Sequence, residues 1–109
     1  DGATRHQVDR RILDAVGPDG TVVNIARGAV IDETALIEAL ETGSLGSAGL
    51  DVFENEPNVP ERLARLDNVV MTPHIGGFTN ATQADALAAL VANIENYFRT
   101  GRPIAVVNI

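Results

Sequence analysis

The sequence TVVNIARG at residues 21–28 decides the fold class of this 109-residue chain. Its first five residues predict a buried strand, which ends just before an arginine and a glycine. A helical pattern precedes the strand, with Asp9 as its expected N-cap and Gly17 as its stop. A second helical pattern follows, from the expected N-cap Asp32 to a stop at Gly43. Helix and strand therefore alternate from the start of the chain.

The same alternation continues to the end of the sequence. Residues 48–52 and 69–72 are two further apolar runs that predict strands, with a short helix expected between them at residues 61–66. Residues 79–99 carry apolar side chains on one stripe and predict a long helix. This order is typical of an α/β domain with a doubly wound parallel sheet and crossover helices. Because the expected strands are continuously apolar, we expect the sheet to be buried on both faces.

Composition narrows the classes of function. A chain of 109 residues is one domain at most. Its net charge of −7 would repel phosphate backbones, so we expect no nucleic-acid partner. No apolar stretch approaches the roughly 18 residues that a membrane helix needs, so we expect no membrane partner. With no cysteine, the chain has neither a disulfide nor a thiolate metal site, which is compatible with the cytoplasmic location that we expect.

Charged side chains follow each of the three expected strands. Arg27 comes after the first, Glu54 and Glu56 after the second, and His74 after the third. Ligands of open parallel sheets bind at the carboxyl ends of the strands, so these side chains are expected to meet there. A guanidinium can grip a carboxylate with two hydrogen bonds, and a histidine, with an ordinary pKa of about 6.5, transfers protons near neutral pH. The combination predicts a site that binds and protonates a small 2-oxo acid.

Each of these residues also has a plainer interpretation. A lone arginine at a strand end, or a lone histidine in a loop, is more often polar surface. Both glutamates could be solvated loop acids, and spacing alone does not choose between Glu54 and Glu56. Asp51 ends a buried strand, where an acid is unfavourable without a partner, and a turn or helix cap is an equal alternative for it. His6 reads as a surface residue, and two histidines far apart in different contexts predict no metal site.

Three motifs occur in a fixed order: NIARG at residues 24–28, LDVFENEP at residues 50–57 and TPHIGG at residues 72–77. They resemble the Asn-x-x-Arg-Gly, Leu-Asp-Val-Phe-x-x-Glu-Pro and Thr-Pro-His motifs of the D-isomer-specific 2-hydroxyacid dehydrogenase family. The similarity runs from about residue 4 to about residue 103. The resemblance implies a Rossmann-like fold and hydride transfer between NAD or NADP and a small 2-oxo or 2-hydroxy acid.

The resemblance also implies roles for individual residues. Arg27 would bind the carboxylate and carbonyl of the substrate, and His74 would be the general acid in reduction and the base in oxidation. The family glutamate stands directly before a proline, so it corresponds to Glu56, which would pair with His74. The residues implied in cofactor binding are Ile25, Ala26, Arg27, Asp51, His74, Gly76 and Gly77, with Asp51 at the nicotinamide end.

The Gly-x-Gly-x-x-Gly motif of dinucleotide sites is missing from the sequence. We therefore expect residues 1–109 to be the C-terminal portion of an NAD(P)-binding domain, with the glycine-rich half and the substrate domain outside this sequence. The resemblance is nearest to the glyoxylate/hydroxypyruvate reductase branch and implies a homodimeric parent protein. Two alternatives stay open, since the family also includes dinucleotide-sensing corepressors that bind proteins, and the chain could be an inactive truncated fragment.

Overall fold

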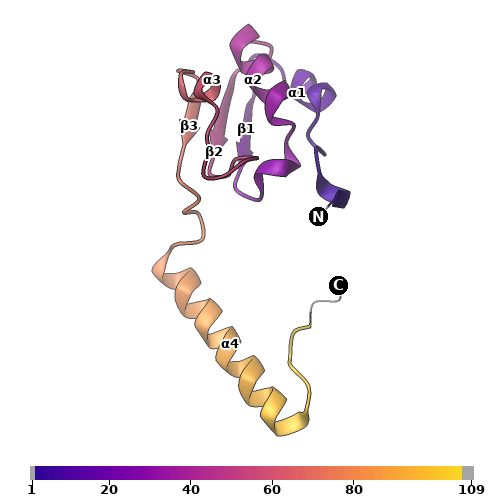
Figure 1. The fold of residues 1–109 in the computed structure, drawn as a ribbon, viewed down its shortest axis with the longest axis vertical. Helices are drawn as coiled ribbons and strands as arrows, with labels where there is room; N and C mark the ends of the chain where they lie inside the picture. Colours follow the sequence, from indigo (N-terminus) through magenta and orange to yellow (C-terminus); the bar gives the residue numbers. More distant parts are fainter. Residues whose placement is uncertain (1, 107–109) are drawn as a thin grey trace. The chain divides into compact units, whose positions relative to one another are not determined.

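The computed structural model describes residues 2–106, which fall into two compact units divided after Ile75. The first unit holds three helices, three strands and two single 3-10 turns (Figure 1). In chain order these are η1 (Gly2–Thr4), α1 (Arg10–Val16), β1 (Thr21–Asn24), η2 (Gly28–Val30), α2 (Glu33–Thr42), β2 (Ser47–Leu50), α3 (Glu61–Ala64) and β3 (Val69–Met71).

Helices α1 and α2 begin and end at the predicted residues, whereas α3 begins at Glu61 as predicted but ends at Ala64, before the predicted end at residue 66. The carboxylate of Asp9 accepts the Ile12 N–H at 3.1 Å and caps α1. Asp32 caps α2 in the same way, by accepting the Ala35 N–H at 3.1 Å. Gly43 ends α2 in the left-handed conformation with a φ of 72°, which a glycine adopts without steric cost. Local sequence signals therefore set these helix boundaries.

The three strands form one parallel sheet in the order β1-β2-β3. In its register Val22, Ala48 and Val69 lie side by side across the sheet. The carboxyl ends of all three strands consequently reach the same edge, and the loops that follow them carry the charged motifs. The predicted α/β class with a parallel sheet is confirmed.

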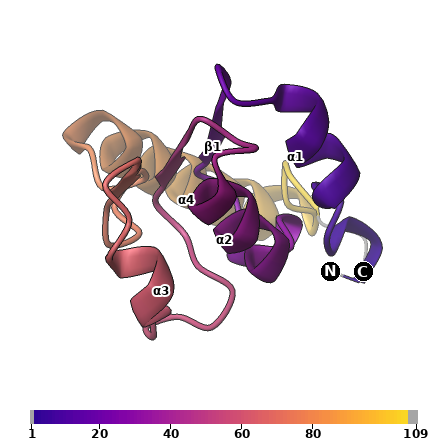
Figure 2. The ribbon, with the colours of Figure 1, turned by 90° about the horizontal axis from the view of Figure 1, so that it is seen from above.

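Only one face of the sheet is covered in the first unit. Helices α1 and α2 pack against each other, and their apolar residues form a core with Ala48 and Leu50 of β2 (Figures 1 and 2). On the opposite face Val23 is 66% exposed and Val70 is 72% exposed. The prediction that both faces are buried is therefore wrong for the described structure. Apolar strand residues show that a face can be covered, but they do not show that the covering elements belong to the same stretch of chain.

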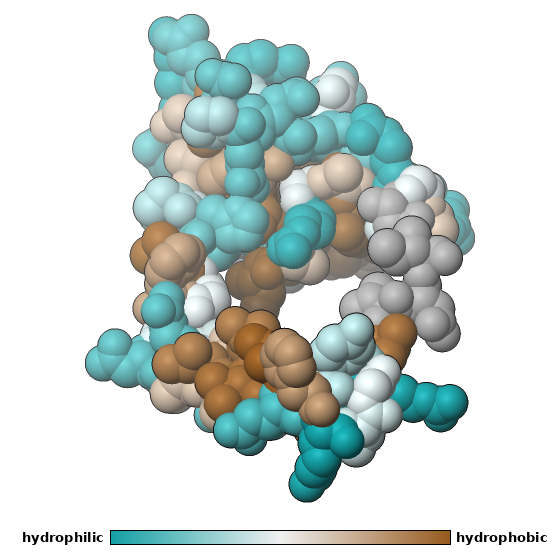
Figure 3. Space-filling view, turned by 60° about the horizontal axis from the view of Figure 1, so that its bottom comes forward, coloured by the Kyte–Doolittle hydropathy of each residue, from teal (hydrophilic) through white to brown (hydrophobic). Residues whose placement is uncertain are grey.

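The second unit contains the long helix α4 (Asn80–Thr100). The hydroxyl of Thr79 accepts the Thr82 N–H at 3.1 Å as its N-cap, and Gly101 ends it in the left-handed conformation. None of its side chains is buried, and the predicted apolar stripe lies open, as the apolar surface on this part of the molecule shows (Figure 3). In residues 2–106, no helix combines the length and the apolar character needed to cross a bilayer.

Candidate active site

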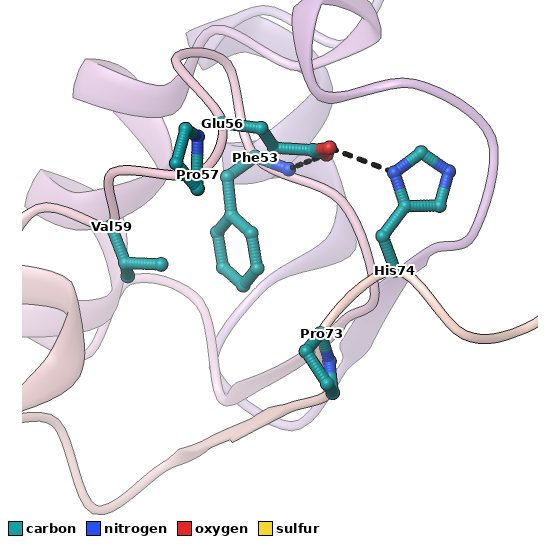
Figure 4. A pocket seen from close by; sticks show the side chains of 6 residues that line it. All are labelled: Phe53, Glu56, Pro57, Val59, Pro73 and His74. Atoms are coloured by element: carbon teal, nitrogen blue, oxygen red, sulfur yellow. Dashed lines mark hydrogen bonds and ion pairs between the residues drawn. The ribbon is translucent and has the colours of Figure 1, made fainter.

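Glu56 and His74 form a hydrogen-bonded pair at the carboxyl edge of the sheet. Oε2 of Glu56 lies 2.7 Å from Nδ1 of His74, and Oε1 accepts the Phe53 N–H at 2.9 Å (Figure 4). Both carboxylate oxygens therefore form a hydrogen bond. The one to the Phe53 N–H comes from the same loop as Glu56 and fixes the orientation of the carboxylate. Among residues 2–106, the other ring nitrogen, Nε2, has no hydrogen-bond partner. That nitrogen is the one left to exchange a proton with a ligand.

The electrostatics of the pair favour an ionised carboxylate. The hydrogen bond from His74 and a second one from the Phe53 N–H hold the pKa of Glu56 below the usual glutamate value. The positive charge of Arg27 adds to this effect. Glu56 consequently stays negatively charged near neutral pH and accepts a hydrogen bond from the N–H at Nδ1. This contact fixes the orientation of the ring.

Arg27 lies in a turn that follows β1 and is held by a buried asparagine. The side-chain amide of Asn24 accepts the Ala26 N–H at 3.1 Å and donates to the Arg27 carbonyl at 3.0 Å. The Arg27 guanidinium is exposed and donates to the Ala26 carbonyl at 2.7 Å. One cavity of about 450 Å³ is lined by Arg27, Glu56 and His74 together with neighbouring loop residues. The three residues predicted from separate motifs are thus brought to one cavity.

The loop of Arg27 and the loop of Glu56 touch backbone to backbone. A Cβ atom placed on Gly28 would lie 2.0 Å from the carbonyl carbon and oxygen of Phe53. No real side chain tolerates such a distance, so only glycine permits this approach. The requirement for glycine after Arg27 is therefore a matter of packing between two site loops.

Asp51 holds the segment that carries His74. It is only 5% exposed, and its Oδ1 accepts the Ile75 N–H at 2.9 Å and a short hydrogen bond from the Thr72 hydroxyl. His74 itself adopts a φ of 55°, in the left-handed region. The two hydrogen bonds to Asp51, one before His74 in the chain and one after it, restrain this unfavourable backbone conformation. The turn-cap interpretation of Asp51 is supported by these contacts, and its expected contact with a cofactor stays a prediction.

Glu54 has different partners from Glu56. Its carboxylate forms an ion pair with Arg5 and lies 3.1 Å from Nε2 of His6. His6 is half-buried and adopts a φ of 52°. The interpretations of Glu54 as a solvated loop acid and of His6 as plain surface are therefore wrong. The signals that could have revealed them are weak, because Arg5 and His6 lie far from Glu54 in the sequence.

The residues expected around a cofactor are only partly assembled. Ile25, 73% exposed, and Ala26 lie at the end of β1 beside Arg27. Gly76 and Gly77 belong to the second unit, and their expected part in cofactor binding stays a prediction. Among residues 2–106, no group of three histidine, cysteine or acidic side chains could hold a metal ion.

A small apolar cavity lies behind the pair. It measures about 180 Å³ and is flanked by Phe53, Val59 and Pro73 (Figure 4). In Figure 4 the ring of His74 extends away from these apolar side chains. The cavity therefore lies on the far side of the ring from the nitrogen that is left for a ligand.

Three residues that hold the site were not assigned by the sequence analysis. Asn24 ties the Arg27 turn, Thr72 donates to Asp51, and Glu33 accepts the Glu54 N–H at 3.0 Å. Two signals were usable. Asn24 and Thr72 stand in the Asn-x-x-Arg-Gly and Thr-Pro-His motifs, and an amide inside a strand pattern is unusual. An acid at the start of a helix, such as Glu33, is ordinary because it complements the helix dipole.

Comparison with known proteins identifies the family. Residues 1–76 match the D-isomer specific 2-hydroxyacid dehydrogenase, NAD binding domain. The chain is 48% identical over 101 residues to hydroxyphenylpyruvate reductase of Plectranthus scutellarioides, covering 93% of this chain and 32% of that protein. It is 50% identical over 95 residues to a glyoxylate/hydroxypyruvate reductase of Arabidopsis thaliana, covering 87% of this chain and 30% of that protein.

A solved structure shows the same fold. The NADPH-dependent glyoxylate/hydroxypyruvate reductase of Sinorhizobium meliloti, in complex with NADP and malonate, superposes with a TM-score of 0.90 at 40% identity. The match covers 98% of this chain and 34% of that one. The chain thus spans about a third of the length of the relatives it matches. The chain belongs to the D-isomer specific 2-hydroxyacid dehydrogenase family, and its residues 1–76 match the NAD binding domain of that family.

Proposed function

We propose that the protein containing this chain transfers a hydride between NAD(P)H and a small 2-oxo acid, with Arg27, Glu56 and His74 as its catalytic residues. The observation that carries the proposal is the cavity that these three side chains share, with Glu56 bonded to Nδ1 of His74 at 2.7 Å. A cation for a carboxylate and an oriented proton donor are what the reduction of a 2-oxo acid requires.

Arg27 binds the substrate in this proposal. Its guanidinium is exposed at the cavity, and within residues 2–106 one of its donors is engaged, by the Ala26 carbonyl. The free donors can form two parallel hydrogen bonds to the carboxylate and carbonyl oxygens of a 2-oxo acid. This grip would fix the carbonyl carbon in one orientation for hydride transfer.

His74 moves the proton. In reduction, Nε2 of the imidazolium donates its proton to the carbonyl oxygen as the C–H bond forms, and a 2-hydroxy acid results. In oxidation the neutral ring takes the hydroxyl proton back. Glu56 does not exchange protons with substrate in this scheme. It orients the ring through Nδ1 and favours the charged form that reduction consumes.

The nicotinamide cofactor, NAD or NADP, supplies the hydride when bound. The exposed apolar surface of Ile25 beside Arg27 fits the nicotinamide end of such a cofactor. Ala26, Asp51, Gly76 and Gly77 complete the proposed contact set. The sequence contains no Gly-x-Gly-x-x-Gly, so the phosphates require residues other than these.

The finer assignments are also proposals. Glyoxylate and hydroxypyruvate are the substrates we propose first, because relatives with these names match most of the chain. We propose residues 1–109 as the C-terminal portion of the cofactor domain of a longer protein. A homodimeric parent and a cytoplasmic location stay predictions, as do the corepressor-like and inactive-fragment alternatives.

The test is an assay of the full-length parent with NADH or NADPH and a panel of 2-oxo acids that includes glyoxylate and hydroxypyruvate. We expect turnover at about 1–1000 per second, and a loss of about 100-fold or more in His74→Gln. Glu61→Gln, at an exposed acid on α3 paired with Arg65, is the surface control and should retain activity. Absence of turnover with every 2-oxo acid of the panel would refute the proposed enzymatic function and favour the corepressor-like alternative.

A further inference from the structure

Glu33 is a buried carboxylate that the proposed reaction does not use. It is 8% exposed and lies in the first turn of α2, directly after the N-cap Asp32. Within residues 2–106 no cation forms an ion pair with it. Burying a carboxylate without a cation is unfavourable, although the positive end of a helix offsets part of the cost. A residue that only complemented the helix dipole could have stayed in water.

The carboxylate of Glu33 forms a hydrogen bond with the loop that carries Glu56. Its Oε2 accepts the Glu54 N–H at 3.0 Å. The preceding N–H of the same loop, that of Phe53, is donated to Oε1 of Glu56 at 2.9 Å. The N–H groups of Phe53 and Glu54 therefore each donate a hydrogen bond to a carboxylate. Phe53 donates to Glu56 of the proposed catalytic pair, and Glu54 donates to Glu33 of α2. The contacts form a continuous series from α2 through this loop and Glu56 to Nδ1 of His74.

The backbone of this loop also packs closely against the turn that contains Arg27 and Gly28. A Cβ atom on Gly28 would lie 2.0 Å from the Phe53 carbonyl and 2.4 Å from the Glu54 nitrogen. The backbone of residues 53–54 thus contacts both Gly28 and the carboxylate of Glu33. Loss of the Glu33 acceptor would leave a partly buried N–H without a partner, which is unfavourable. The loop would relieve this cost by turning the Glu54 N–H toward water, and the Phe53 N–H would move with it.

We propose that Glu33 is a positioning residue that holds Glu56 in reach of His74 by fixing the orientation of residues 53–54. Its kinetic consequences rest on the function proposed above. The geometric part does not, because the protonation of His74 can be followed without turnover. Glu33 touches neither substrate nor cofactor and acts only through Glu56.

The test compares Glu33→Ala, Glu33→Gln and Glu38→Ala in the full-length parent. In Glu33→Ala the reduction should lose activity at lower pH than in the wild type, by roughly half a unit, because a displaced Glu56 stabilises the imidazolium less. We expect kcat to fall about three- to tenfold while KM stays within about twofold, since ring orientation and not substrate binding is impaired. Glu33→Gln keeps an amide oxygen for the Glu54 N–H and should behave as the wild type. Glu38, an exposed acid of the same helix near Arg10, is the matched control and should have no effect.

A second measurement separates positioning from general destabilisation. NMR of selectively labelled histidine, with His74 assigned through His74→Gln, should show the ring losing its proton at lower pH in Glu33→Ala. In a Glu56→Gln background the Glu33→Ala change should add no further shift, because the residue acts through Glu56. If Glu33→Ala does not fold, Glu33→Asp withdraws the oxygen by one methylene and serves instead. A lower melting temperature with an unchanged pH profile and unchanged ring titration would overturn the inference. A shifted ring titration without turnover of any 2-oxo acid would support it and reject the proposed function.

Discussion

Oε2 of Glu56 lies 2.7 Å from Nδ1 of His74, although 18 residues separate the two in the chain. The contact joins the loop after β2 to the loop after β3, and it leaves Nε2 for a ligand. Glu54, two residues before Glu56, turns instead toward Arg5 and His6. The difference between these two glutamates leads directly to a test.

Glu56→Gln should narrow the pH range of reduction from its alkaline side. A carboxylate favours the protonated imidazole, and reduction requires that form. Removal of the charge should therefore move the alkaline limit of kcat/KM for reduction in the parent to lower pH. Oxidation needs the neutral ring and should suffer less at high pH. Glu54→Gln can still accept from Arg5 and should leave the limit in place, and the reverse result would exchange the two assignments.

Arg27→Lys should weaken substrate binding although it keeps the charge. A lysine cannot reproduce the two parallel hydrogen bonds of a guanidinium to a carboxylate. The loss of one charge-assisted hydrogen bond corresponds to about 1.5–3 kcal/mol, or roughly a 10- to 100-fold fall in kcat/KM. Steady-state kinetics of the parent with glyoxylate or hydroxypyruvate measures it. Equal kcat/KM values for the variant and the wild type would remove Arg27 from the substrate site.

Gly28→Ala should destabilise the fold, because the new methyl group would overlap the Phe53 carbonyl. Overpacking of this kind costs about 1–3 kcal/mol, and the thermal midpoint of the parent should fall accordingly. Gly49→Ala on β2 is the control. Its Cβ would lie 3.6 Å from the nearest side-chain atom, an ordinary contact, so the midpoint should hardly change. Similar midpoints for both variants would show that the two loops do not pack as described.

The 109-residue chain by itself should have no measurable reductase activity. It carries the proposed catalytic side chains but no glycine-rich phosphate motif, so a dinucleotide would bind weakly. Incubation of the purified chain with NADH or NADPH and glyoxylate, followed at the absorbance of the reduced cofactor, makes the test. Rates in the range of ordinary enzymes, about 1–1000 per second, would contradict this expectation.

The isolated chain should also associate in solution. Val23 and Val70 lie open on the sheet, and Leu87, Val91 and Phe98 are exposed on α4. Open apolar surface of this extent favours self-association. Sedimentation of the chain should show species larger than the monomer, and Leu87→Lys combined with Phe98→Lys should reduce them. Gln83→Lys combined with Asn93→Lys adds the same charge without removing an apolar side chain and should do so less. A monomeric wild-type chain would refute the expectation.

Local sequence signals determined the order of the helices and strands and the ends of α1 and α2. Asp9 and Asp32 cap these helices as predicted, because an N-cap needs only a short polar side chain next to the first free N–H groups. The meeting of Arg27 with the loops after β2 and β3 also followed from the sequence. Parallel strands place their carboxyl ends at one edge, so a charged residue after each strand must lie near the others.

Residue spacing did not decide which acid serves which partner. The family resemblance implied Glu56 for His74, and the tertiary structure shows that contact and the separate contacts of Glu54 with Arg5 and His6. Glu54 and Glu56 lie in one short loop, and spacing along the chain contains no information on which way a loop side chain turns. The packing of Gly28 on Phe53 and the bond from the Glu54 N–H to Glu33 decide that orientation, and both join residues more than 20 positions apart. The burial of Glu33 and the open second face of the sheet likewise depend on contacts between segments far apart in the chain. A local sequence pattern does not predict which distant segments pack together, so these features could not be derived from it.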